Sequence, residues 1–193
     1  MNPTARLKVT TERNFSAHHM LIGAARASLE DAKAKQPGWF YSELVAITLS
    51  ALSIEAMCNA IGDRVIPDWK DFESSSPNAK LRLLCERLKV QYSKSEEPWV
   101  SARWLFKFRN LIAHAKPEFV REEKLFSREE YDNRSPEFPK SKLEKGVTLG
   151  NASRAVYAAE QIKDILCTRV PPEDAFGLYS DSSFGCASPH HDG

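Results

Sequence analysis

The sequence predicts an all-α protein: a bundle of about five helices with a charged excursion and a C-terminal tail. Apolar residues recur at three- and four-residue spacings through most of the chain, whereas the alternation typical of strands is scarce. Most of the 8 glycines and 11 prolines stand at the edges of these periodic segments. A length of 193 residues suits one domain with a substantial core. We therefore expect one helical domain over residues 1–170, carrying a charged insertion at 118–147, and a disordered tail at 171–193.

The first two helices are predicted on either side of a Pro-Gly break. One runs from about Asn14 to Lys35 and ends before Pro37. The second, Tyr41 to Ile66, is apolar on most of its faces, as expected for the central helix of a bundle. Pro67 ends it, because proline lacks the backbone donor and clashes with the preceding turn.

A polar loop at 68–76 then leads to two further helices. The third opens at Pro77, a residue favoured at the first helical position. The fourth begins near Pro98 and runs to about Ala115, because the residue before a proline disfavours the α region. The apolar side of the third helix carries Leu81, Leu84 and Leu88.

The rest of the chain is predicted as an excursion, one more helix and a tail. Residues 118–147 are highly charged and rich in helix breakers, and we expect one short helix there, at 119–131. The last helix spans roughly 152–169. Residues 171–193 have the composition of a tail without fixed structure. The apolar stripe of the last helix consists of Val156, Ala159, Ile162 and Leu166.

The bulk composition excludes some classes of function. Net charge is +1, so no overall basic field attracts nucleic acid or membrane, and any such binding needs a local patch. The N-terminal sequence lacks the apolar core of a signal peptide. The longest apolar stretch, 44–61, is interrupted by polar residues and indicates a buried helix, not a membrane span. We expect a cytoplasmic protein without membrane contact.

Metal and cofactor sites are not expected either. The four cysteines form no C-x-x-C pair, and Cys58 and Cys85 lie in apolar helical patterns that favour small buried hydrophobes over ligands. The doublets His18-His19 and His190-His191 lack further ligands at the spacing of a metal site. The sequence predicts neither a metal nor another cofactor.

Two hexapeptides share a pattern, "RNFSAH" at 13–18 and "RNLIAH" at 109–114. Arginine followed by histidine at such spacing arises readily by chance, so the context decides. In the first copy Asn14 and Ser16 are capping residues at a helix start. Arg13 is then expected in solvent and His18 at the surface or partly packed, so we treat this copy as a chance match.

The second copy ends the most aromatic helix. At about 100° per residue, one side carries Trp104, Phe108, Leu111 and Ala115, with Leu105 and Ile112 beside them. The opposite stripe consists of Arg103, Lys107, Asn110 and His114, and its cations suit a phosphate-bearing ligand.

Arg109 stands apart from this stripe. It is rotated about 140° from His114 on a straight helix, so it borders the apolar side. The two side chains converge on one atom only if the helix end distorts near Pro117, or if a second subunit contributes. This geometry predicts a homodimer.

Three stretches together resemble the HEPN superfamily of all-helical domains: "SELVAITLSALSIEAMCNAI", "AKLRLLCERL" and "WLFKFRNLIAHAKPE". The motif of that superfamily is Arg, four to six residues and His, often with a polar residue after the Arg. It falls here on Arg109, Asn110 and His114, and the resemblance covers roughly residues 13–169.

The resemblance implies a metal-independent endoribonuclease that acts as a dimer. Members of the superfamily serve in toxin–antitoxin pairs, phage defence and RNA processing, and other members lack the activity. RNA would be the substrate, with an antitoxin or regulatory protein as a further partner.

The residue types suit this chemistry. Histidine transfers protons near neutrality, and arginine presents a planar charged fork to phosphate oxygens. His114 would remove the proton of the ribose 2′-hydroxyl, Arg109 would stabilise the charged phosphorus, and Asn110 would bond the phosphate or the imidazole. The expected product is a 2′,3′-cyclic phosphate, and DNA would not be cleaved.

Each role has a structural alternative. His114 could merely close the helix C-terminus. Arg109 could pair with an acid of the core, for which Glu55 on the second helix is the candidate, with Asn59 one turn on. Arg103, Lys107 and Lys116 could follow the RNA backbone or form an ordinary solvated face. A second hypothesis is therefore a non-catalytic HEPN-like module that binds a nucleotide or a protein.

Overall fold

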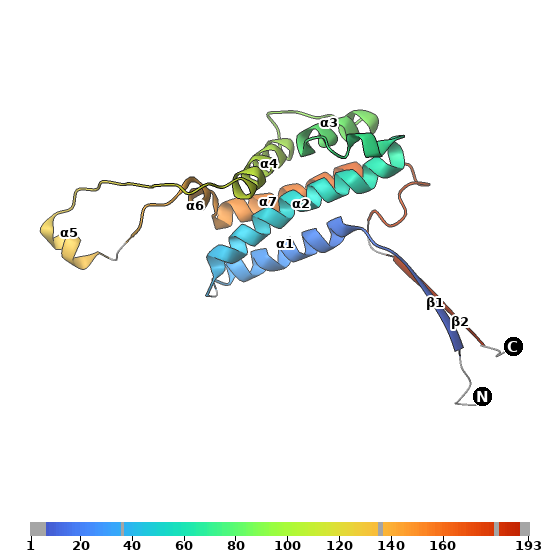
Figure 1. Cartoon of the computed structure of the whole chain (residues 1–193), viewed down its shortest axis with the longest axis horizontal. Coiled ribbons are helices and arrows are strands. Elements are labelled where there is room, and N and C mark those ends of the chain that lie inside the picture. Colours follow the sequence, from blue (N-terminus) through green and yellow to red (C-terminus); the bar gives the residue numbers. More distant parts are fainter. Residues whose placement is uncertain (1–6, 36, 135–136, 180–181, 190–193) are drawn as a thin grey trace.

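The computed structural model describes residues 7–35, 37–134, 137–179 and 182–189. Helices make up 61% of the chain, which confirms the all-α prediction (Figure 1). A small two-stranded sheet accompanies them. The helices are α1 (Ala17–Lys33), α2 (Trp39–Val65), the 3₁₀ helix η1 (Trp69–Phe72), α3 (Pro77–Arg87), α4 (Trp99–Ala113), α5 (Arg128–Asn133), α6 (Lys142–Gly146) and α7 (Leu149–Cys167). The strands are β1 (Leu7–Asn14) and β2 (Ser182–Pro189).

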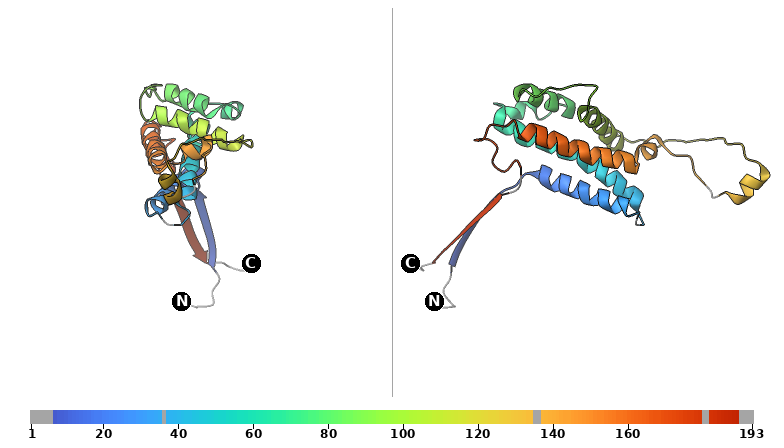
Figure 2. Two further views of the ribbon diagram at one scale, coloured as in Figure 1. Left: turned by 90° about the vertical axis from the view of Figure 1, so that its left-hand side faces the viewer. Right: turned by 180° about the vertical axis from the view of Figure 1, so that it is seen from behind.

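Helix α2 is the centre of the bundle. It contacts α1, α3, α4 and α7, and the views of Figure 2 show these helices gathered around it. This arrangement explains why its sequence is apolar on most faces, as predicted. Its side chains supply much of the core, including the fully buried Ile47, Ile54 and Ile61.

Among the described residues, α2 alone has the length and composition of a membrane span, with a mean hydropathy of 1.7 over an 18-residue window. Half of that window is buried inside the bundle. The central helix of a water-soluble bundle has the same properties. The expectation of no membrane contact stays a prediction.

Local sequence signals set several helix boundaries as predicted. Ser76 caps α3 by accepting a hydrogen bond from the backbone N–H of Ala79, and Pro77 follows at the first helical position. The predicted apolar stripes of α3 and α7 are buried. In the excursion, the two short helices α5 and α6 replace the predicted helix at 119–131. Each begins with a capping box, in which a serine and the glutamate three residues later bond each other's backbone N–H groups. The periodicity of apolar residues, on which the prediction was based, does not detect this motif.

The excursion and the sheet extend from the bundle in different directions (Figure 1). Helix α1 starts at Ala17 with Ser16 as its N-cap, close to the predicted start near Asn14, and residues 7–14 form strand β1, which was not predicted. Residues 171–179 and 182–189 have defined structure, in contrast to the predicted tail without fixed structure, and the other residues of that tail lie outside the described part of the chain. Strand β2 pairs antiparallel with β1, with Thr10 opposite Cys186. The paired residues are far apart in the sequence, from Asn14 with Ser182 to Leu7 with Pro189. A local sequence pattern therefore cannot predict this strand pairing.

The segment before β2 is also fixed against the bundle. Leu178 is fully buried, and its carbonyl oxygen lies 3.1 Å from Nε2 of His18. Nη1 of Arg64 donates to the carbonyl oxygens of Asp174 and Phe176, at 2.7 and 2.5 Å. This part of the predicted tail therefore belongs to the helical domain.

One glycine in α2 is required by a close approach. A Cβ atom on Gly62 would lie 2.4 Å from ring atoms of Trp69, which is 3% exposed. The predicted polar loop at 68–76 therefore contains a buried aromatic anchor in η1, and Gly62 provides the space for its ring.

Candidate functional site

The second hexapeptide lies at the end of α4. Arg109 lies just before the last turn of α4, Asn110 follows, and His114 is the C-cap, with φ −117° and ψ 21°. The backbone N–H of His114 donates to the carbonyl oxygen of Asn110 at 3.0 Å. The side chains of Asn110 and His114 are exposed, whereas that of Arg109 is only 25% exposed.

The buried side of α4 differs from the predicted one. It runs through Leu105, Phe106 and Phe108, whereas Leu111 is 39% exposed. At about 100° per residue, Arg109 falls between Leu105 and Phe106, so it points toward the bundle and does not merely border the apolar side. The reason is that α4 packs on both α2 and α7, and this contact rotates the helix toward Phe106.

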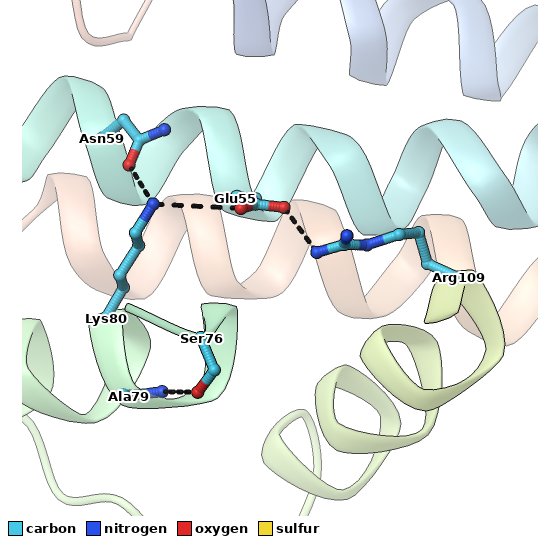
Figure 3. A network of polar contacts seen from close by, with 6 residues as sticks. All are labelled: Glu55, Asn59, Ser76, Ala79, Lys80 and Arg109. Atoms are coloured by element: carbon cyan, nitrogen blue, oxygen red, sulfur yellow. Dashed lines mark hydrogen bonds and ion pairs between the residues drawn. The ribbon is translucent and has the colours of Figure 1, made fainter. Parts of the chain in front are cut away.

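Arg109 reaches the central helix. Its Nη2 atom donates to Oε2 of Glu55 at 2.8 Å, and both side chains are about one quarter exposed (Figure 3). The ion pair predicted as the structural alternative for Arg109 is therefore present. Such a pair fixes the direction of the guanidinium group without consuming all of its five donors.

Lys80 joins the same cluster and was not predicted. It is 2% exposed, and its Nζ atom donates to Oδ1 of Asn59 at 3.0 Å and lies 3.8 Å from Oε1 of Glu55 (Figure 3). The available signal was its place four residues before Leu84, on the apolar side of α3. We call Glu55, Asn59, Lys80 and Arg109 the α2–α3–α4 polar cluster.

The cluster carries more positive than negative charge. Lys80 and Arg109 are cations, Glu55 is the one carboxylate that pairs with them, and Asn59 is neutral. The Nε atom of Arg109 is buried and has no hydrogen-bond partner among the described residues. One positive charge of the cluster is therefore left without a carboxylate partner, while the Nε donor itself is shielded from solvent.

The predicted cationic stripe is exposed along most of its length. Lys107 is exposed on α4, and Lys116 is exposed beyond its end. Arg103 is half-buried, and its Nη1 atom donates to the carbonyl oxygen of Lys94 at 3.0 Å, so it is partly engaged within the chain. Neither Asn110 nor His114 makes a side-chain hydrogen bond or ion pair with the polar cluster in the part of the chain that the structure describes.

The first hexapeptide has a structural role. Arg13 lies in β1, and its guanidinium group is 5.0 Å from the ring centroid of Phe15. The Oγ atom of Ser16 donates to the carbonyl oxygen of Gly177 at 3.3 Å. His18 is fully buried, whereas it was expected at the surface or partly packed, and its Nε2 atom is hydrogen-bonded to the Leu178 carbonyl oxygen. This side chain holds the C-terminal segment against α1.

Cys58 and Cys85 have the environment of buried hydrophobes, as predicted. Burial raises the pKa of Cys58 far above its ordinary value and that of Cys85 to about 12, so both stay protonated near neutrality. Among the described residues, no three His, Cys, Asp or Glu side chains gather as metal ligands. The doublet His190-His191 lies outside the described residues.

Comparison with protein-family models, with curated proteins and with solved structures finds no match for this chain. The resemblance to HEPN proteins therefore stays a prediction from the sequence.

Proposed function

We propose that the chain is a metal-independent endoribonuclease that acts as a homodimer, with Arg109, Asn110 and His114 at its active site. The observation that carries the proposal is the excess positive charge of the polar cluster, placed at the same end of α4 as an exposed histidine. A partly buried guanidinium in a cluster with excess positive charge suits a phosphate oxygen, because the interaction strengthens where water is partly excluded.

In the proposed reaction, Nε2 or Nδ1 of His114 removes the proton from the ribose 2′-hydroxyl. The O2′ atom then attacks phosphorus, the P–O5′ bond breaks, and the departing O5′ takes a proton from an imidazolium. The products are a 2′,3′-cyclic phosphate and a 5′-hydroxyl. Arg109 stabilises the charge on the phosphoryl oxygens, and Asn110 bonds the phosphate or the imidazole.

In the proposed dimer, the second chain supplies a histidine close to Arg109. Arg109 points toward Glu55 in the bundle, while His114 lies exposed where α4 ends. A second copy that meets this end of α4 would place its own His114 near Arg109 and could provide the acid for the leaving group. Lys107 and Lys116 would then follow the RNA backbone, with Arg103 as a weaker contributor.

The second candidate is a non-catalytic module that binds a nucleotide or a protein through the same surface. The observation that favours it is the ion pair itself, which gives Arg109 a structural purpose. Both candidates fit a cytoplasmic protein. A role as a toxin or phage-defence effector, neutralised by an antitoxin or regulatory protein, belongs to the ribonuclease proposal alone.

The deciding experiment incubates the purified protein with mixed RNAs in the presence of a chelator. We expect cleavage with cyclic phosphate ends, and a loss of at least about 100-fold in the Arg109→Ala and His114→Ala variants. Arg26→Ala is the matched control, because Arg26 on α1 forms an exposed ion pair with Glu160 on α7 and makes no contact with the polar cluster among the described residues. Wild-type cleavage by folded Arg109→Ala and His114→Ala would overturn the mechanism.

The oligomeric state gives an independent test. Size-exclusion chromatography with light scattering is expected to show a dimer. A strict monomer at every concentration would contradict a site shared between two chains. Absence of cleavage by a dimer, with any bound antitoxin removed, would favour the binding module.

A further inference from the structure

The ammonium of Lys80 is a buried charge that the proposed reaction does not use. The residue is 2% exposed, in the first turns of a short helix. Removing an ammonium from water is costly unless acceptors compensate. Its acceptor at hydrogen-bond distance is Oδ1 of Asn59, and its charged partner is Glu55, at 3.8 Å. Because the side chain of Lys80 is hidden from water, its charge does not serve to make the surface soluble and must act inside the protein.

The two oxygen atoms of Glu55 face different cations. Oε1 is the atom nearest Lys80, and Oε2 accepts from Arg109 at 2.8 Å (Figure 3). A carboxylate is planar, so restraining one oxygen also restrains the direction of the other. Lys80 on α3 therefore limits rotation of the group that holds Arg109 on α4.

The backbone around Lys80 is itself fixed. The N–H of Lys80 donates to the carbonyl oxygen of Ser76 at 3.0 Å, and the hydroxyl of Ser76 accepts from Ala79 at 3.3 Å (Figure 3). Pro77 adds a fixed φ angle to the same turn. The ammonium thus extends from a rigid helix start toward α2.

We propose that Lys80 is a positioning residue for Arg109, acting through the carboxylate of Glu55. Without the ammonium, the carboxylate is free to rotate and the guanidinium samples more orientations. The inference rests on the proposed ribonuclease only for its effect on cleavage. Its effect on the Arg109 side chain is independent of any reaction.

A spectroscopic test follows from the buried Nε atom of Arg109. The Nε–Hε group gives its own ¹H–¹⁵N resonance, identified by its loss in Arg109→Ala. Lys80→Met keeps a side chain of similar length but removes the charge. We expect this variant to shift the Arg109 resonance and to lower its heteronuclear NOE. The matched control is Lys33→Met, which removes an exposed lysine paired with Glu30 and should leave the resonance unchanged.

A double substitution separates positioning from a general loosening of the fold. In a Glu55→Met background, Lys80 has no carboxylate through which to act. Adding Lys80→Met there should not change the Arg109 resonance further. If Glu55→Met does not fold, Asn59→Ala replaces it, because loss of Oδ1 frees the ammonium and should also move the resonance.

The cleavage assay gives a second readout. We expect Lys80→Met to lower kcat roughly 10-fold and to leave KM within about twofold of the wild-type value. A wrongly oriented arginine loses more of its stabilisation of the transition state than of its contribution to RNA binding. An Arg109 resonance identical in wild type and folded Lys80→Met would overturn the inference. A resonance that responds, in a protein that cleaves no RNA, would support the inference and refute the ribonuclease proposal.

Discussion

The Oε2 atom of Glu55 and the Nη2 atom of Arg109 lie 2.8 Å apart and join the central helix to the C-terminal part of α4. The two residues are 54 positions apart in the sequence. Their contact fixes the end of the helix that carries the second hexapeptide. The ion pair therefore links the stability of the bundle to the geometry of the candidate site.

The first prediction concerns the loss of this carboxylate. Glu55→Ala leaves the cations Lys80 and Arg109 without a charged partner, so we expect the free energy of unfolding to fall by about 1–3 kcal/mol. Urea denaturation, monitored by circular dichroism, measures the free energy of unfolding of the variant and of the wild type. Glu160→Ala, which breaks an exposed pair with Arg26, should cost under about 1 kcal/mol.

A double variant tests the cause of that loss. Lys80→Met in the Glu55→Ala background removes one of the two unpaired cations, so part of the lost stability should return. If Glu55→Ala is as stable as the wild type, the two cations do not depend on the carboxylate. The positioning scheme would then lose its physical basis.

The sequence predicted three of the four residues of the polar cluster, with Asn59 named as the residue one turn beyond Glu55. Glu55 attracts notice because an acid among apolar helix positions needs a partner, and Arg109 because it begins a motif. Lys80 and its bond to Asn59 were not predicted, since a single lysine near the start of a helix normally extends into water. Its burial depends on where α3 crosses α2, which is a property of the tertiary fold.

Dependence on the tertiary fold also explains where the fold predicted from the sequence differs from the structure. Helical periodicity located the major helices because each one buries a continuous apolar stripe. The pairing of β1 with β2 joins the two ends of the chain, and neither strand has a strong pattern of its own. Leu178 stands in the short stretch 175–179, which has no helical or strand period, so its full burial could not be inferred from its neighbours.

The second prediction compares two helical glycines. Alanine normally stabilises a helix interior by roughly 0.5–1 kcal/mol relative to glycine. At Gly23 nothing lies within 4 Å of the added Cβ, so Gly23→Ala should stabilise the protein by about that amount. At Gly62 the Cβ meets the Trp69 ring at 2.4 Å, so Gly62→Ala should destabilise it by about 1–3 kcal/mol.

Thermal and urea unfolding of both variants gives the comparison. A gain in stability for Gly62→Ala would show that the Trp69 ring is not packed against α2. Loss of stability for Gly23→Ala would contradict its open surroundings on α1. The opposite signs are the result that the structure requires.

The third prediction is a pH dependence that originates at Glu43. This carboxyl is 2% exposed, and burial raises its pKa above the ordinary value of 4.5, although the backbone N–H of Leu149 and the charge of Lys140 lower it in part. The folded state then holds the proton more tightly than the unfolded state. The resulting stability is complete below the unfolded pKa and is lost as the pH rises through the folded pKa.

Glu43→Gln removes this titration. The difference in free energy of unfolding, variant minus wild type, should therefore grow from pH 4 toward pH 7 in a series of urea titrations. All other acids contribute equally to both proteins, so the difference isolates Glu43. A flat difference, or one that falls with pH, would show that the carboxyl is not destabilised by its burial.

The fourth prediction tests the docked C-terminal segment. A chain ending at Val170 loses the side chain of Leu178 from the core and both acceptors of Arg64. Burial of one leucine stabilises a fold by about 1.5–3 kcal/mol, so we expect the free energy of unfolding to fall by about 2–3 kcal/mol.

A chain ending at Tyr179 keeps these contacts and loses only β2. An isolated two-stranded ribbon is marginally stable in water, so this shorter truncation should cost no more than about 1 kcal/mol. Urea unfolding of both truncations, next to the full chain, measures the two losses. Equal stability of the chains ending at Val170 and Tyr179 would mean that the contacts of Leu178 and Arg64 contribute nothing. The prediction from the sequence, of a tail without fixed structure from 171 onward, would then be right in energetic terms.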